Sequence, residues 1–293
     1  MRKALRFPLS FVILAIVAFT GFIRPAMAED AAPAAFSLQD ILVTPTRIVF
    51  EGDMRSAELA LVNRSDKVRS YALSFLQCRM TESGEIHELD PATKPLPGEN
   101  FADPYVRFTP RRVVLEPRQV QMVRMIIRKP ADLPDGEYRS HLNFRLIPSS
   151  EDATKPDSLG KGISIKLVPI YGVMIPVIVR QGALTARLRL TTLKLITKGE
   201  PATPYLSLSI EREGGQSSYG DLEVLWRAAG SKTLSLGMLR GVAVYTPNTH
   251  RIVEVPFSLP RGVRLREGQL SVRFMDHDIG AEKIFAESQL DLP

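Results

Sequence analysis

Residues 138–147 read Tyr-Arg-Ser-His-Leu-Asn-Phe-Arg-Leu-Ile, and this stretch decides the fold class. The apolar residues Leu142, Phe144 and Leu146 alternate with polar ones. A two-residue period is typical of a β-strand that buries one face. We therefore expect a half-buried strand whose polar face, including His141, is exposed to solvent.

Most of the chain on either side repeats this pattern. Turn-forming clusters such as Asn63-Arg64-Ser65-Asp66 separate the alternating segments, and the 22 prolines and 19 glycines favour turns over a helical bundle. About seven short strands with frequent turns predict a β-sandwich. Besides 138–147, the strands expected in the first half are 45–50, 56–63, 69–78, 111–115 and 119–128.

The second half predicts a further set of strands. Residues 149–162 are polar and aperiodic, which indicates a loop, and the apolar run 163–179 follows. Proline cannot donate to a ladder, so Pro176 requires an edge or a bulge in that strand. We place the domain boundary near Gln181-Gly182. The later strands are expected at 184–195, 204–212, 221–227, 233–245, 251–258, 269–275 and 282–292.

The first 28 residues have the three parts of a secretory signal peptide. A basic start is followed by an apolar core, and Ala26-Met27-Ala28 offers small residues for cleavage. An uncleaved N-terminal anchor is the alternative, but it needs a longer apolar core. Cleavage would leave a short flexible N-terminus, 29–36, ahead of two domains at 37–181 and 182–293, with no membrane span in the mature chain.

Charge and motifs exclude several function classes. Four of the 38 basic residues lie in the first 28 positions, which leaves 34 against 32 acidic residues, so the basic pI is no argument for nucleic-acid binding.

The single Cys78, expected to be buried, excludes a disulfide framework. The chain has no Gly-x-Ser-x-Gly elbow, phosphate loop or His-Glu-x-x-His. The only dense cluster of possible metal ligands, Asp276-His277-Asp278, is interpreted as a solvated turn. We therefore expect that the protein is not an enzyme and binds neither a metal nor a cofactor.

Five motifs of the first half carry a resemblance to a known family. They are Val43-Thr-Pro-Thr-Arg-Ile-Val-Phe50, Leu61-Val-Asn-Arg-Ser65, Val113-Val-Leu-Glu-Pro117, Gln121-Met-Val-Arg124 and Leu133-Pro-Asp-Gly-Glu-Tyr-Arg-Ser-His-Leu-Asn-Phe-Arg-Leu-Ile-Pro148. In their order and spacing the chain resembles the periplasmic pilus-assembly chaperones, the PapD-like family. The resemblance is good over about residues 38–181 and holds only in outline beyond them. It implies two immunoglobulin-like β-sandwiches set at an angle, with a cleft between them.

The resemblance implies a function in the periplasm. Such a chaperone lends an edge strand to a pilus or fimbrial subunit that lacks its last strand, and an outer-membrane usher then takes the subunit. In this chain Ile163, Ile165 and Leu167 would supply the apolar side chains of the lent strand, although they would equally suit the chain's own core. A secreted adhesion or surface-coat protein with the same fold and no client is the competing interpretation.

The family also holds the subunit's C-terminal carboxylate with two basic residues. The resemblance implies that Arg47, in Pro-Thr-Arg-Ile-Val-Phe, is the first of them. A guanidinium suits this role because its donors grip a carboxylate in a bidentate fork. The alternative is that Arg47 is an ordinary surface residue whose side chain covers apolar neighbours. The second position falls near Val173-Met174-Ile175, which has no base, and Lys166 is a weak candidate. The second anchor is therefore left open.

Overall fold

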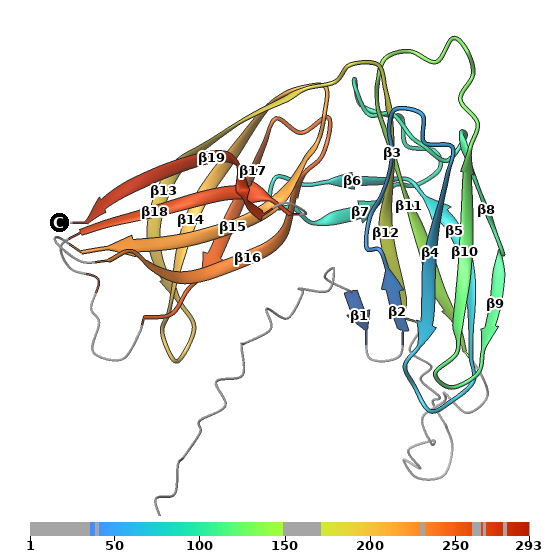
Figure 1. Ribbon diagram of the computed structural model, residues 1–293, viewed down its shortest axis with the longest axis horizontal. Helices are drawn as coiled ribbons and strands as arrows, with labels where there is room; N and C mark the ends of the chain where they lie inside the picture. The colour runs from blue at the N-terminus through green and yellow to red at the C-terminus, as the bar shows by residue number, and fades with distance from the viewer. Residues whose placement is uncertain are drawn as a thin grey trace, which may run out of the picture. The chain divides into compact units, whose positions relative to one another are not determined.

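The computed structural model describes residues 36–38, 41–148, 171–228, 232–259, 265, 268–277 and 280–292. All of them belong to one unit, Pro33–Pro293, and their regular structure is entirely β (Figure 1). This confirms the all-β prediction. The predicted signal peptide, 1–28, lies outside the described residues. Within the described part, no helix is long and apolar enough to cross a membrane.

Two sheets form the first sandwich. Their inward-facing side chains make one apolar core that runs from Ile41 to Val179. One sheet has the order β1 (Phe36–Leu38), β2 (Ile41–Thr44), β4 (Ser56–Asn63), β10 (Val120–Ile127) and β8 (Val106–Thr109). The other has the order β3 (Ile48–Phe50), β12 (Gly172–Gln181), β11 (Gly136–Ile147), β5 (Arg69–Leu76) and β9 (Arg112–Leu115).

The second sandwich has its own core, which runs from Leu190 to Phe274. Its first sheet has the order β13 (Ala186–Lys198), β14 (Thr203–Gly214) and β17 (His250–Pro256). Its second has the order β16 (Leu234–Val244), β15 (Ser218–Arg227), β18 (Gly268–Asp276) and β19 (Gly280–Leu292). The prediction of two β-sandwiches is therefore confirmed.

The first predicted strand, 45–50, is wrong in its extent. β2 ends at Thr44 and pairs antiparallel with β4, whereas β3 starts at Ile48 and runs parallel to β12 in the opposite sheet. Pro45, which has no N–H to donate, lies between the two strands. The chain thus crosses from one sheet to the other there, and Arg47 lies at the crossing point.

Two side chains fix the chain at a turn and at the start of a strand, and the turn, 63–66, was predicted from the sequence. The buried Asn63 amide donates to the backbone oxygens of Lys67 and Leu115 at 2.7 and 3.0 Å and accepts from the Ser65 N–H, which closes the 63–66 turn. Tyr138 donates its hydroxyl to the oxygen of Pro134 at 2.9 Å. This bond is the tyrosine corner of immunoglobulin-like sandwiches, and it sets the start of β11.

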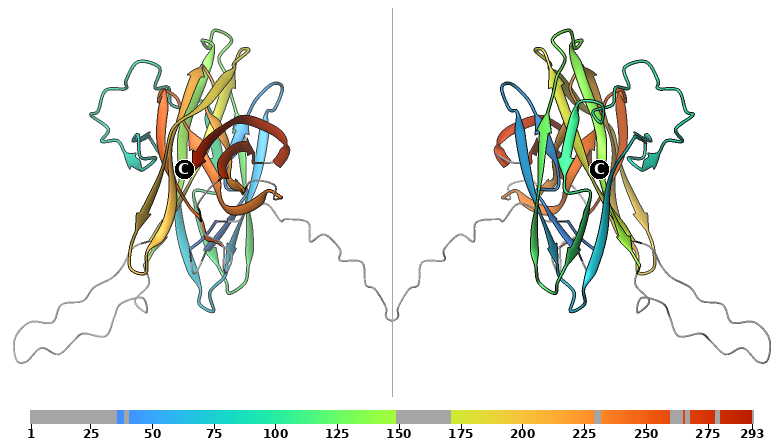
Figure 2. Two further views of the ribbon diagram at one scale, coloured as in Figure 1. Left: turned by 90° about the vertical axis from the view of Figure 1, so that its left-hand side faces the viewer. Right: turned by 90° about the vertical axis from the view of Figure 1, so that its right-hand side faces the viewer.

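A short hairpin links the first sandwich to the second. β6 (Cys78–Met80) and β7 (Ile86–Glu88) pair with each other, and Figure 2 shows this teal segment beside the sheets. The oxygen of Met80 accepts from Asn248 Nδ2 at 3.0 Å, and the oxygen of Glu82 accepts from the Ile252 N–H at 2.8 Å. The buried position predicted for Cys78 is confirmed, and burial raises the pKa of its thiol to about 11.

Candidate functional site

The register of three strands gathers basic residues on one face of the β3–β12–β11–β5–β9 sheet. Alternate residues of β3 and β11 fill the core of the first sandwich, so Arg47, Arg139 and His141 lie on the opposite face. Pro176 pairs with His141 and directly precedes Val177, the partner of Ile48. Pro176 therefore lies between Arg47 and His141 across the sheet.

Side chains of the second sandwich cover this face. The Arg47 guanidinium carbon lies 4.7 Å from the centre of the Tyr219 ring, and that of Arg139 lies 4.4 Å from the centre of the Tyr245 ring. Tyr245 also packs with Ile178 in a small apolar cluster. Both contacts are cation–π interactions, which hold planar guanidinium groups against the rings.

Several hydrogen-bond donors on this face are buried without a described partner. Arg139 is 4% exposed, and its Nε and Nη1 have none, while its Nη2 makes a long bond of 3.3 Å to the oxygen of Cys78. Arg47 Nε is also buried and has no hydrogen-bond partner among the described residues. Burial lowers the pKa of both guanidinium groups, and Arg180 lowers that of Arg47 further.

His141 contradicts the prediction of an exposed imidazole. It is 3% exposed, because Tyr245 of the second sandwich lies against it with ring centres 6.3 Å apart. Burial, and then the charge of Arg139, lower the pKa of His141 to about 3. The imidazole is therefore neutral at neutral pH, and its Nδ1 has no partner among the described residues.

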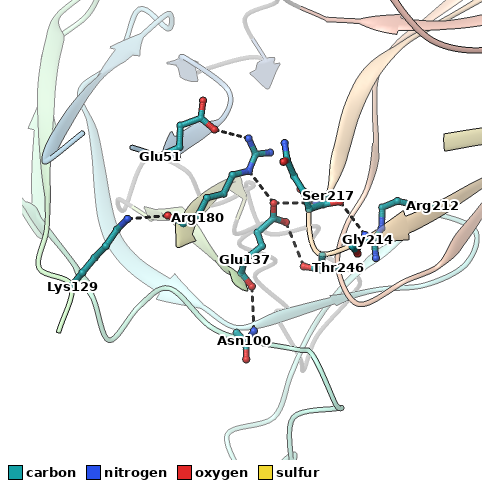
Figure 3. A network of polar contacts seen from close by, with 10 residues as sticks. Glu51, Asn100, Lys129, Glu137, Arg180, Arg212, Gly214, Ser217 and Thr246 are labelled. Carbon is teal, nitrogen blue, oxygen red and sulfur yellow. Dashed lines mark hydrogen bonds and ion pairs between the residues drawn. The ribbon is translucent and has the colours of Figure 1, made fainter. Parts of the chain in front are cut away.

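A buried carboxylate joins the two sandwiches beside this face (Figure 3). Glu137 Oε2 accepts from Arg180 Nε and from the Ser217 N–H, both at 3.1 Å, and Thr246 Oγ1 donates to Oε1 at 3.4 Å. Arg180 also binds Glu51 at 2.8 Å. Because Ser217 and Thr246 belong to the second sandwich and Glu137 to the first, this network fixes one against the other.

Within the part of the chain that the structure describes, one edge of β12 is open over half of its length. β11 pairs with β12 from Gly172 to Gln181, whereas β3 pairs with it only from Val177 to Val179. Residues 172–176 therefore have no neighbouring strand on that side within the described residues, which corresponds to the first of the two alternatives, an edge or a bulge, predicted at Pro176. The open edge ends beside Arg47. Exposed backbone donors and acceptors of this kind can pair with another strand.

The other predicted residues are placed as follows. Ile163, Ile165, Leu167 and Lys166 lie outside the described residues. In the Asp276-His277-Asp278 cluster, the His277 Nδ1 binds Asp221 at 2.7 Å, and no group of side chains in the described residues could hold a metal. The sequence did not single out Arg139, because only the position of the second sandwich shows that it is buried.

No known family model and no curated protein matches the sequence. Solved structures of fimbrial chaperones align with most of the chain. The Pseudomonas aeruginosa CupB2 chaperone is 13% identical with a TM-score of 0.42, and the match covers 85% of this chain and 98% of that one. The E. coli chaperone DraB is 15% identical with a TM-score of 0.39, covering 86% and 96%. A chain of the Salmonella enterica SafA pilin–SafB chaperone complex is 15% identical with a TM-score of 0.40, covering 88% and 99%.

Proposed function

We propose that this protein is a periplasmic chaperone that binds, folds and protects pilus or fimbrial subunits by donor-strand complementation and delivers them to an outer-membrane usher. The observation that carries the proposal is the edge of β12 at residues 172–176, which has no neighbouring strand among the described residues. This edge ends beside Arg47, whose buried Nε has no hydrogen-bond partner in the same part of the chain. The five sequence motifs that resemble the pilus-assembly chaperones support it independently.

The chemistry of such a complex follows from this geometry. A subunit that lacks its last strand exposes an apolar groove and unpaired backbone groups, and it aggregates by itself. The edge of β12 would pair with that backbone, and the strand upstream would fill the groove with Ile163, Ile165 and Leu167. The subunit's terminal carboxylate would bind Arg47, which fixes the register of the added strand. No covalent bond is made or broken.

The competing function is a secreted adhesion or surface-coat protein with the same fold. Such a protein needs neither an open strand edge nor an arginine with an unpaired buried donor at the end of that edge. Burying an unpaired donor costs about 1–3 kcal/mol, which favours a role in which a ligand supplies the acceptor. The chaperone therefore accounts for more of the structure.

Purification of the tagged full chain from periplasm, followed by mass spectrometry, tests the proposal. The expected partner is a small secreted β-sandwich subunit whose sequence is one strand short. Chains with Arg47→Ala and with the exposed Arg112→Met serve as test and control, and only the first should lose the subunit. Recovery of no subunit by the unaltered chain would contradict the chaperone function.

A further inference from the structure

We propose that the β6–β7 hairpin is a latch that keeps one face of the first sandwich closed. The hairpin belongs to the first sandwich, and its tip binds residues 245–252 of the second, which form the turn between β16 and β17 and the start of β17. In this turn Tyr245 lies against Arg139 and His141 of β11. Detachment of the tip would release the turn and expose both side chains to water. The inference goes beyond the proposed function and does not depend on it.

The base of the hairpin is fixed to the first sandwich. Arg79 of β6 donates from Nε and Nη2 to the two oxygens of Glu99, at 2.9 and 2.6 Å. Glu99 is buried, and a bidentate pair of this kind is among the stronger hydrogen-bonded contacts in proteins. At the same end of the hairpin, the Leu89 N–H donates to the oxygen of Gln77 at 2.8 Å. These contacts hold the base whether or not the tip is attached.

The tip of the hairpin binds the turn and the strand that follows it. Asn248 Nδ2 donates to the oxygen of Met80 at 3.0 Å, and the Ile252 N–H donates to the oxygen of Glu82 at 2.8 Å. The Met80 side chain is buried in the small apolar cluster that contains Tyr245. Hydrogen bonds and a buried apolar side chain therefore attach the tip to the second sandwich.

Gly84 gives the tip a close approach that only glycine allows. Its φ is +89°, and a Cβ there would lie 2.2 Å from Nε of Arg251 in β17. The Arg251 guanidinium donates from Nη1 to the oxygen of Ala243 at 2.7 Å, so moving it away from the tip breaks that bond. A side chain at position 84 should therefore push the tip off the second sandwich.

The closed arrangement buries polar atoms that lack partners. Nε and Nη1 of Arg139 and Nδ1 of His141 have no hydrogen-bond partner among the described residues. Burying such atoms is unfavourable, because water binds them when they are exposed. Opening of the turn would hydrate them, whereas the contacts of the tip oppose opening. Opposing effects of this kind give a closed state in equilibrium with a minor open one.

Footprinting of the histidines with diethyl pyrocarbonate tests the latch on the full chain. The reagent acylates neutral imidazoles, and mass spectrometry gives the rate at each one. His141 is buried, whereas 63% of the His87 side chain is exposed, so His87 serves as an internal reference. Gly84→Ala should raise the rate at His141 at least tenfold and leave the rate at His87 within twofold of that in the unaltered chain.

The matched control for this variant is Gly52→Ala. Gly52 also has a positive φ, +55°, but a Cβ there would meet no atom within 4 Å, so this change should leave the rate at His141 as it is. Trp226, the only tryptophan, lies in the core of the second sandwich. Its fluorescence should stay the same in both variants, which separates detachment of the hairpin from unfolding.

Two results would overturn the latch. Equal rates at His141 in Gly84→Ala and Gly52→Ala would show that the tip does not hold the turn closed. A rate at His141 in the unaltered chain equal to that at His87 would show that the face is open already. Should Gly84→Ala change the fluorescence of Trp226, Asn248→Ala takes its place, because it removes the bond to Met80. An unchanged rate at His141 in that variant would equally overturn the latch.

Discussion

Replacing Glu137 with glutamine should destabilise the protein far more than replacing Glu51 with glutamine. Both carboxylates bind Arg180, Glu137 at 3.1 Å and Glu51 at 2.8 Å. The Glu137 side chain is fully buried, whereas 62% of the Glu51 side chain is exposed. The two substitutions therefore remove the same charge from the same guanidinium in different surroundings.

The expected magnitudes differ severalfold. Removing one partner of a buried ion pair costs about 3–5 kcal/mol, whereas an exposed pair contributes at most about 1 kcal/mol. Glutamine at position 137 would also place an amide N–H₂ among the donors of Arg180, Ser217 and Thr246. At about 2–4 °C per kcal/mol, Glu137→Gln should lower Tm by about 6–20 °C and Glu51→Gln by no more than about 4 °C.

Thermal unfolding followed by circular dichroism at neutral pH measures both values. Since Glu137 joins the two sandwiches, the melting curve of Glu137→Gln should also broaden or separate into two transitions. A Tm within about 2 °C of the Glu51→Gln value would refute the reasoning, because burial would then add nothing to this ion pair.

Three further predictions concern the client and pH. Arg47→Ala should reduce subunit accumulation at least tenfold while the chaperone stays folded, since a charge-assisted hydrogen bond is worth about 1.5–3 kcal/mol. Arg47→Lys should reduce subunit accumulation only in part. An unchanged pilus yield in Arg47→Ala would exclude Arg47 as the carboxylate anchor. Replacing Ile165 and Leu167 together with serine should weaken subunit binding by about 3–6 kcal/mol with little change in Tm, and a large fall in Tm would assign them to the chain's own core instead. The pKa of His141 in the folded protein is lowered to about 3. Below about pH 6.5 the unfolded chain therefore binds more protons than the folded protein does. The free energy of unfolding should then fall on acidification by up to about 1.4 kcal/mol per pH unit. His141→Asn should flatten this dependence in urea unfolding at pH 5 and pH 7, and an identical slope would contradict it.

The sequence by itself determined which side of its alternating strands faces the core. The alternation in 138–147 predicted that Leu142, Phe144 and Leu146 would be buried, and all three are at most 7% exposed. Such patterns are local, because the side-chain period of a strand is fixed by its backbone. Arg47 was singled out because the residues around it resemble a family motif, and an edge or a bulge was predicted at Pro176 because proline has no N–H to donate.

Only the tertiary structure decided which polar residues are buried. His141 and Arg139 lie on the face that the alternation predicted to be solvated, and they are buried because the second sandwich, whose strands begin about 45 residues later, covers that face. No local period encodes such a contact, since it depends on how two cores that are distant in the sequence pack against each other. The carboxylate of Glu137 accepts from Arg180 of the first sandwich and from Ser217 of the second. Among the described residues, Nε and Nη1 of the buried Arg139 have no hydrogen-bond partner.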